Sequence, residues 1–280
     1  MASLARMDSS FAGNSWKLIA AFAIRRFFRI YPLSMITVLV VILFRIASAP
    51  GLTYTWIGWP HVASNLALTQ NLTDSPYVLA VLWTLPLEIQ MYCFLPFIYF
   101  FIRKSSYRPL VVWGLAVIAA VFIPKISPRL GMFAVAPCFV AGVVAYGLHK
   151  LIRPRWPAWV WLCAILLAIC LYGPLDDISL ARKMKIAWVL TLALAVVFPF
   201  CREIRSRFLS RMCNSVAKYS YGIYLSHSIV FTIALHTMAG SPLAVRLLLL
   251  AAGCIVLPVA MYHLIEHPLI RVGSALADRL

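Results

Sequence analysis

The sequence predicts an all-α fold, a polytopic transmembrane helix bundle of about eight spans, and three observations support this prediction. Of the 280 residues, 63% are hydrophobic and 12% are charged, whereas soluble domains are about 45–50% apolar and about 25% charged. Apolar runs of the roughly 20 residues that a bilayer requires recur along the whole chain. The 25 Lys and Arg residues, against 8 Asp and Glu, gather between these runs. Because so apolar a chain cannot cover itself with water-compatible surface, lipid must be part of its solvent.

The apolar runs define the expected elements. Helices are expected at residues 30–48, 79–102, 108–124, 130–149, 157–173, 184–201, 217–238 and 243–266. This divides the chain into a cytoplasmic N-terminal segment 1–29 with a basic entry, a transmembrane domain 30–266 and a cytoplasmic C-terminal tail 267–280. No small-residue cleavage site precedes the first run, so a cleavable signal peptide is not expected.

The positions of the basic residues predict the orientation in the membrane. Cytoplasmic loops of membrane proteins carry an excess of Lys and Arg, and 18 of the 25 fall in segments that eight helices would place on one side. Those segments are 1–29, 103–108, 149–156, 202–218 and 267–280. The longest loop of the opposite side, 49–78, has none. Both termini are therefore expected in the cytoplasm. The positive-inside rule explains the positive net charge of the chain better than nucleic-acid binding does. A nucleic-acid partner is therefore not expected.

Disulfide and metal chemistry are not predicted. Most of the seven cysteines lie within apolar runs, without a Cys-x-x-Cys pair, and are typical of packing residues. The stretch YHLIEHPLI, residues 262–270, contains His-x-x-Glu-His, which in a soluble helix would indicate an inverted zinc-protease motif. Such a site needs a further carboxylate downstream, and only Asp278 remains there. We interpret the stretch as the cytoplasmic end of a membrane helix, stopped by Pro268 and followed by Arg271.

Three stretches carry polar residues that apolar helices tolerate poorly. In the first, RRFFRIYPL at residues 25–33, Arg26 and Arg29 are three apart and share one face at the entry to the first span. The pair can be a plain topology signal, or it can form a fork for phosphate or carboxylate. Pro32 is expected to mark the start of the helix.

The second stretch is LWTLPLEIQMYCFLP, residues 82–96, in which Glu88 stands inside an apolar run. Pro86 and Pro96 remove backbone hydrogen bonds on both sides of it and open the helix locally. An ionisable group at this depth is a functional candidate by default. The alternative is a structural glutamate, which would need a partner.

The third stretch is KYSYGIYLSHSIVF, residues 218–231. His227 lies well inside its expected span, and Tyr224, three residues earlier, shares its face. Tyr221 and Ser228 are the other polar neighbours in the sequence. A histidine here can act as a general base, or it can be a hydrogen-bonded core residue, and the sequence leaves both open.

Taken in order, these stretches resemble the acyltransferase-3 family of integral membrane acyltransferases, which includes bacterial O-antigen and exopolysaccharide O-acetylases. The family's Arg-x-x-Arg-x-Tyr-Pro entry is similar to Arg26–Pro32. Its Trp-Ser-Leu-x-x-Glu-x-x-Phe-Tyr motif is similar to Trp83–Tyr92, with Glu88 as the acid. Its Ser-Tyr-x-x-Tyr-Leu-x-His motif matches Ser220–His227, and its Glu-x-Pro helix end matches Glu266–Pro268.

The resemblance also sets an expectation for the N-terminal region. Family members usually have ten spans, and the first carries a histidine regarded as essential for acyl transfer. Here the Arg-x-x-Arg entry is already reached at Arg26. We therefore expect the first two spans and that histidine to be lacking. Three alternatives follow: the sequence comes from an N-terminally shortened gene model, the enzyme works through other residues, or the chain is an inactive, truncated homologue.

The function that the resemblance implies is an integral membrane acyltransferase. It would move an acyl group, most simply acetyl from acetyl-CoA, to a hydroxyl of a glycan or glycolipid of the cell envelope. Acyl-CoA, the acceptor and membrane lipid of a bacterial inner membrane are the expected partners, with no bound cofactor or metal. The expected catalytic residues are Glu88 and His227, the donor-binding residues Arg26 and Arg29, and the supporting residues Tyr224 and Glu266. From the residues alone, a membrane carrier or flippase also fits, because prolines within spans and sparse buried charges suit transport.

Overall fold

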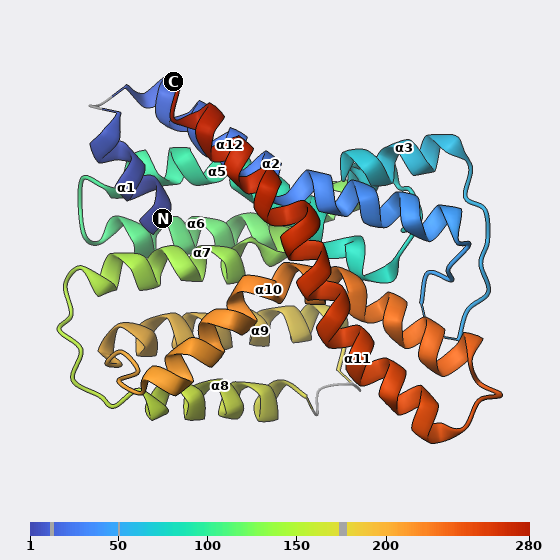
Figure 1. The fold of residues 1–280 in the computed structure, drawn as a ribbon. Helices are drawn as coiled ribbons and strands as arrows, with labels where there is room; N and C mark the ends of the chain where they lie inside the picture. Colours follow the sequence, from blue (N-terminus) through green and yellow to red (C-terminus); the bar gives the residue numbers. More distant parts are fainter. Residues whose placement is uncertain (12–13, 50, 174–177) are drawn as a thin grey trace. The chain divides into compact units, whose positions relative to one another are not determined.

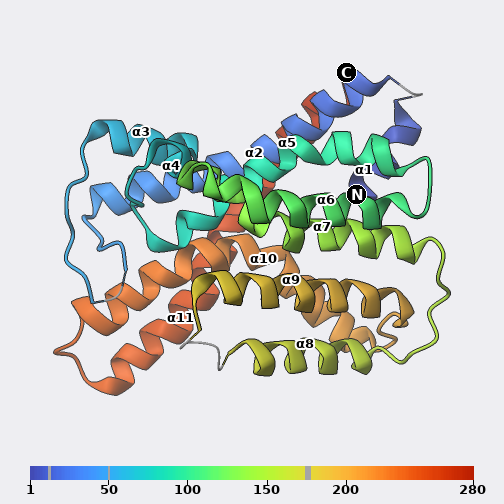
Figure 2. The ribbon, with the colours of Figure 1, turned by 180° about the vertical axis from the view of Figure 1, so that it is seen from behind.

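The computed structural model describes residues 1–11, 14–49, 51–173 and 178–280 (Figure 1, Figure 2). Residues 12–13 of the predicted segment 1–29 and residue 50 of the predicted loop 49–78 lie outside the described residues. Within the described ranges every named element is helical, and the β-type pairing is limited to an isolated bridge between Trp156 and Cys201. The prediction of an all-α fold is confirmed.

The chain divides into two compact units, each described by itself. The first unit comprises Met1–Ser10 and Gln90–Ser210, and the second comprises Phe11–Ile89 and Arg211–Leu280. The helix α5 (Thr84–Ile102) contributes its first residues to the second unit and the remainder to the first.

The first unit is built around α7, which packs between α6 and α9. Its elements are α1 (Ala2–Ser10), most of α5, α6 (Arg108–Phe122), η2 (Ile123–Lys125), η3 (Pro128–Leu130), α7 (Met132–His149), α8 (Trp159–Tyr172), α9 (Leu180–Val197) and η4 (Phe198–Phe200). Figure 2 shows α6, α7, α9 and α8 side by side in that order. Val140 and Val143 of α7 are buried with Met91 and Ile102 of α5, which forms the core of the unit.

The second unit holds the two longest helical stretches. Its elements are α2 (Ser15–Leu43), α3 (Trp59–Ala67), α4 (Gln70–Thr73), η1 (Ala80–Trp83), the start of α5, most of α10 (Arg207–Phe231), η5 (Thr232–Thr237), α11 (Leu243–Met261), η6 (Tyr262–Glu266) and α12 (His267–Ala277). The elements η5 and η6 are π-helical turns. Figure 1 shows α12, in red, running along the N-terminal half of α2, in blue.

Small residues allow the helices of the second unit to approach closely, as is common in membrane proteins. A Cβ atom built at Gly273 of α12 would lie 2.5 Å from the Cβ of Phe28 on α2. A Cβ atom at Gly222 of α10 would lie 3.1 Å from the backbone of Pro258 on α11. At the end of α12, Asp278 accepts a hydrogen bond of 2.5 Å from Arg25 of α2. Gly273 and the ion pair of Arg25 with Asp278 thus fix α12 against α2, and Gly222 lets α10 approach α11.

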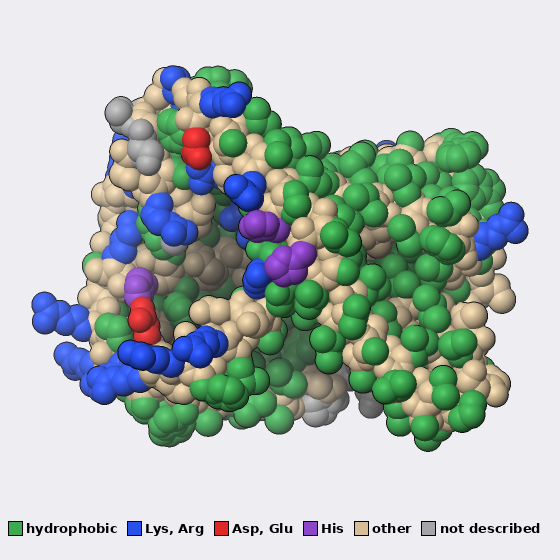
Figure 3. Space-filling view, in the orientation of Figure 1, with side chains coloured by type: hydrophobic (Ala, Val, Ile, Leu, Met, Phe, Trp, Pro, Cys, Tyr) green, Lys and Arg blue, Asp and Glu red, His purple; other side chains and the backbone are tan. Residues whose placement is uncertain are grey.

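Among the described residues, six helical stretches are long and apolar enough to cross a membrane. They are Ser15–Leu43, Ala80–Ile102, Arg108–Lys125, Pro128–His149, Leu180–Phe200 and Leu243–Ala277. The helix α8 is apolar but only 14 residues long. Figure 3 shows hydrophobic side chains spread over much of the exposed face, as lipid-facing helices require. The structure therefore supports an integral membrane protein with six to seven long apolar spans where the sequence predicted about eight.

Two prolines do not have the roles that the sequence predicted for them. Pro32 was expected to start the first helix, but α2 begins at Ser15 and Pro32 lies inside it. Pro268 was expected to stop the last helix, but it stands in the first turn of α12, which continues to Ala277. Proline is tolerated within membrane helices because neighbouring groups and local π-helical adjustments satisfy the freed backbone groups. The predicted helix ends at residues 30 and 266 were wrong for this reason, whereas the limits of the membrane domain at these residues stay a prediction.

Candidate active site

All six residues predicted for the site lie in the second unit. They are Arg26 and Arg29 on α2, Glu88 on α5, Tyr224 and His227 on α10, and Glu266 on η6. The start of α5 and the middle of α10 meet at Tyr224, whose hydroxyl lies 2.6 Å from the hydroxyl of Thr84 and also contacts the carbonyl of Val81. This contact ties α10 to the point where η1 becomes α5.

Glu88 lies one turn beyond Thr84, on the same face of α5. The side chain is half-buried, and its carboxylate interacts electrostatically with the hydroxyls of Tyr221 and Tyr224. Glu88 therefore faces α10 within the unit. Tyr224 is the link between the two candidate catalytic residues, because its ring centroid lies 6.1 Å from that of His227.

The imidazole of His227 is held in a defined tautomer. Its Nδ1 lies 3.1 Å from the carbonyl oxygen of Ile223, four residues earlier in α10. A carbonyl can only accept a hydrogen bond, so Nδ1 must carry the proton and the neutral ring presents Nε2 as its basic atom. The half-buried ring meets Phe231 edge-on at 6.1 Å, and within the described residues Nε2 has no hydrogen-bond partner. A base with a free lone pair can accept a proton from a substrate hydroxyl.

Glu266 is a buried acid with an unsatisfied oxygen. The residue is 4% exposed, and its Oε2 has no hydrogen-bond partner among the described residues. The positive charge of Arg29, which is exposed on α2, attracts this carboxylate. Glu266 ends the π-helical turn η6, and such turns are frequent at functional sites.

Tyr221 joins the two acids, and sequence reasoning did not select it. Its hydroxyl donates a hydrogen bond of 2.8 Å to the carbonyl of Ile30 on α2, and it interacts electrostatically with both Glu88 and Glu266. The spacing of six residues to His227 places Tyr221 off the face of the histidine, so helical periodicity gives no signal for it. Only the tertiary packing of α10 against α2 and η6 brings it into the cluster.

The arginines of the entry have separate surroundings. Arg25 pairs with Asp278, so it serves the packing of α12. The guanidinium of Arg26 lies 5.3 Å from the centroid of the Phe22 ring, and that of Arg29 lies toward Glu266. A shared fork of Arg26 and Arg29 for phosphate stays a prediction.

The His-x-x-Glu-His stretch is divided between different environments. His263 lies 3.2 Å from the hydroxyl of Tyr219, whereas the neighbouring Glu266 is buried. The ring of Tyr262 lies 4.6 Å from the ammonium of Lys218 and 5.6 Å from the ring of His267. In the described part of the chain, no three His, Cys, Asp or Glu side chains are grouped as a metal site would require.

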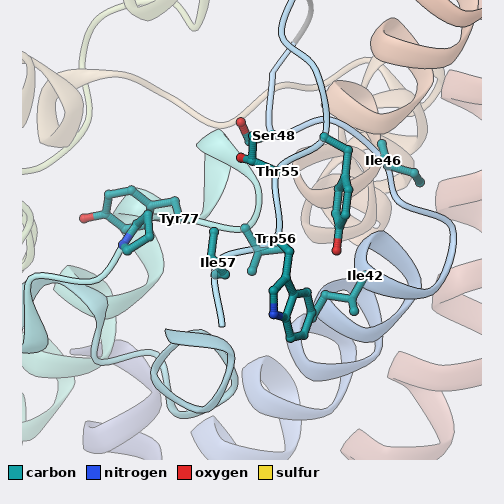
Figure 4. Close-up of a pocket in the computed structure, with 10 residues that line it drawn as sticks. Ile42, Ile46, Ser48, Thr55, Trp56, Ile57 and Tyr77 are labelled. Carbon is teal, nitrogen blue, oxygen red and sulfur yellow. The ribbon is translucent and has the colours of Figure 1, made fainter. Parts of the chain in front are cut away.

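A cavity of about 110 Å³ opens at the C-terminal end of α2 (Figure 4). Aromatic rings and hydroxyl groups line it together, from Ser48, Tyr54, Thr55, Trp56 and Tyr77, beside Ile42 of α2. In the view of Figure 4, the side chain of Ile57 lies between the rings of Tyr77 and Trp56. Such a mixture of apolar rings and a few polar groups is typical of small-molecule sites.

A buried asparagine holds the walls of this cavity in place. Asn65 of α3 is fully buried, and its Nδ2 donates to the carbonyls of His61 and Pro76 at 2.8 and 2.9 Å. Its Oδ1 accepts hydrogen bonds of 3.0 Å from the side chain of Gln70 and the backbone of Val78. All four hydrogen-bonding capacities of the amide are thereby used. The segment that carries Tyr77 is consequently fixed to α3.

Comparison with known proteins gives one match. A family model described as an acyltransferase domain matches residues 9–264. No curated protein and no solved structure matches the chain.

Proposed function

The chain belongs to the acyltransferase-3 family of membrane acyltransferases, and from this premise we propose that it moves an acetyl group from acetyl-CoA to a hydroxyl of a glycan or glycolipid. The reaction belongs to the modification of cell-envelope polysaccharides, in a bacterial inner membrane with both termini in the cytoplasm. The observation that carries the proposed chemistry is the free Nε2 of His227, oriented by the carbonyl of Ile223.

His227 is the proposed general base. Its Nε2 takes the proton of the acceptor hydroxyl while that oxygen attacks the thioester carbonyl carbon. The new C–O bond forms, the C–S bond of the thioester breaks, and the CoA thiolate leaves with the proton from the imidazolium. No further reactant is needed. Glu88 is proposed to stabilise the imidazolium, because both Glu88 and His227 interact with Tyr224 and a nearby negative charge favours the protonated ring.

The donor is proposed to bind at the N-terminal half of α2. Arg26 and Arg29 supply positive charge for the phosphates of CoA, and guanidinium groups bind phosphate with paired hydrogen bonds. Arg29 is exposed and has no hydrogen-bond partner within the described residues, so its donors are available. The buried carboxylate of Glu266 attracts Arg29 and is proposed to orient its guanidinium for the donor.

The acceptor is proposed to bind in the cavity at the other end of α2. Trp56 and Tyr77 offer rings for the apolar face of a sugar, and Ser48 and Thr55 offer hydroxyls for its polar edge. Arg29 and Ile42 are separated by about 20 Å of helix, at about 1.5 Å per residue. This separation supports donor and acceptor sites at opposite ends of α2.

The test uses the purified full chain in phosphatidylcholine vesicles. The donor is acetyl-CoA with a labelled acetyl group, and the acceptor is a lipid-linked bacterial oligosaccharide. We expect label on the acceptor together with an equal amount of free CoA thiol. Neither label nor thiol above the level of protein-free vesicles would overturn the proposal. Movement of unmodified acceptor across the vesicle membrane without thiol release would support the carrier instead.

A further inference from the structure

A second cavity, of about 190 Å³, lies within the first unit, where α5 ends and α6 begins. The C-terminal end of α7 closes it, because Gly147 of α7 packs directly on Pro109 of α6: a Cβ atom at Gly147 would lie 2.6 Å from the Cγ of this proline. Two of the apolar spans, Ala80–Ile102 and Pro128–His149, end at this cavity. It therefore lies at the depth of a membrane surface.

Three cations converge on the cavity together with two hydroxyls. Arg103, Lys104 and Lys150 line it beside Ser105 and Ser106. Lys104 is exposed and has no partner in the described part of the chain. The ammonium of Lys150 lies 4.6 Å from the centroid of the Tyr146 ring, which holds it at the cavity wall.

One acidic side chain meets this basic cluster. Asp8 of α1 accepts hydrogen bonds from the guanidinium of Arg103 at 3.3 Å and from the hydroxyl of Tyr99 at 3.0 Å. Arg103 is therefore partly neutralised, whereas Lys104 and Lys150 are not paired with an acid by any described ion pair. The cavity therefore keeps a net positive charge. Substitution of Asp8 would increase this charge further.

The positive-inside rule explains why basic residues lie on one side of the membrane. It does not explain why three of them line one cavity together with two serines. Lys and Arg with hydroxyl donors form the set that binds phosphate oxygens. Basic pockets between membrane helices at the membrane surface bind lipid headgroups in the same way.

We propose that this cavity binds a phosphate group, carried either by an anionic lipid headgroup or by a soluble phosphate ester such as CoA. The proposal does not depend on the proposed acetyl transfer, because it concerns binding in the first unit alone. Lys104 and Lys150 supply the main attraction, and Arg103 contributes in competition with Asp8.

Binding is measured on the purified full chain with two kinds of probe. For the lipid source, the chain is placed in phosphatidylcholine nanodiscs with or without phosphatidylglycerol, and native mass spectrometry counts the retained anionic lipid. For the soluble source, calorimetry compares CoA with 3′-dephospho-CoA on a chain that carries Arg26→Gln and Arg29→Gln, so that the proposed donor site does not contribute. The double variant Lys104→Gln, Lys150→Gln is expected to weaken binding of the relevant probe by about tenfold or more, since charged hydrogen bonds are lost. Binding should also weaken with ionic strength.

Two further variants separate a built site from diffuse attraction. Arg153→Gln removes the same charge from the exposed segment after α7, outside the cavity, and should leave binding unchanged. Asp8→Asn releases Arg103 and should tighten binding by a few-fold, a change that misfolding cannot produce. If the double variant loses binding of phosphatidylglycerol but not of CoA, the cavity is a lipid site. If it loses binding of CoA but not of phosphatidylglycerol, the cavity is a site for a soluble phosphate ester. Parental binding of both probes by the double variant, or equal weakening by Arg153→Gln, would overturn the proposal.

Discussion

At the scale of single residues, the contact between Tyr224 and His227 follows from their spacing of three along α10. The position of Glu88 opposite the tyrosines does not, because it depends on how α5 packs on α10. The same holds for Tyr221, which reaches Ile30 on α2. Local periodicity thus predicted which residues share a helix face, while the partners across helices required the tertiary structure.

Replacement of His227 or Glu88 by Gln tests their roles in proton transfer. Gln keeps the approximate size and the hydrogen bonding but removes the titrating group. Each variant is expected to insert and accumulate like the parent and to lose acetyl transfer by about 10²-fold or more, the usual scale of general acid–base catalysis. The measurement is initial rate of CoA thiol release, with protein level determined in the same vesicles.

His236→Gln is the matched control for this prediction. His236 is an exposed histidine of η5 in the same unit, outside the cluster of Tyr224 and Glu88, and its variant should keep the parental rate. Near-parental turnover in both the His227→Gln and the Glu88→Gln proteins would make these residues packing groups and would remove them from the mechanism.

At the scale of elements, the sequence identified the helices better than their ends. Composition and run length predicted the helices of residues 79–102 and 130–149 to within two residues. The start of the first helix and the end of the last helix were misplaced, because Pro32 and Pro268 were interpreted as helix boundaries. Both prolines lie in continuous helix. A proline's effect in a membrane helix depends on neighbours that satisfy the backbone, and these are not visible in the local sequence.

The close approach of α12 to α2 gives a prediction on stability. Gly273→Ala should lower the melting temperature of the purified protein, because the added methyl group meets Phe28 and overpacking costs about 1–3 kcal/mol. Gly142→Ala in α7 is the control, since nothing lies within 4 Å of a Cβ atom built there. It should be neutral or stabilising, as alanine favours a helix over glycine by about 1 kcal/mol. Equal melting temperatures of the two variants would show that α12 is not held by this contact.

At the scale of the whole molecule, composition together with recurring apolar runs of about 20 residues was enough to predict an all-helical membrane protein. The number of spans was harder to predict from the sequence. The reason is α10, whose C-terminal half is apolar but whose N-terminal half carries Arg207, Arg211 and Lys218. Such a helix does not reach the hydropathy of the six long apolar stretches, although much of its C-terminal half is buried in the second unit. Hydropathy describes contact with lipid, whereas packing inside the protein decides whether a half-polar helix belongs to the membrane domain.

The orientation of the chain is a prediction that reporter insertions can measure. The segment 202–218 is rich in Arg and Lys, and the loop 49–78 has neither, so the positive-inside rule places them on opposite sides. A compartment-sensitive reporter inserted at residue 210 should be active in the cytoplasm, and one at residue 60 should be active on the other side. Equal signals from the two positions would show that the predicted orientation is wrong.

The π-helical turn η6 has a consequence for insertions and deletions in this part of the gene. A π-helical turn holds about one residue more than an α-helical turn, so the stretch Tyr262–Glu266 contains a surplus residue within the continuous helix Leu243–Ala277. Loss of one codon within η6 is expected to restore regular α-helix there, because four α-helical residues at about 100° each turn the chain about as far as the five residues of the wider turn. Asp278 and Gly273 of α12 would then still face α2. The surplus residue therefore allows this stretch to lose one residue without changing which face of the last helix meets Arg25 and Phe28.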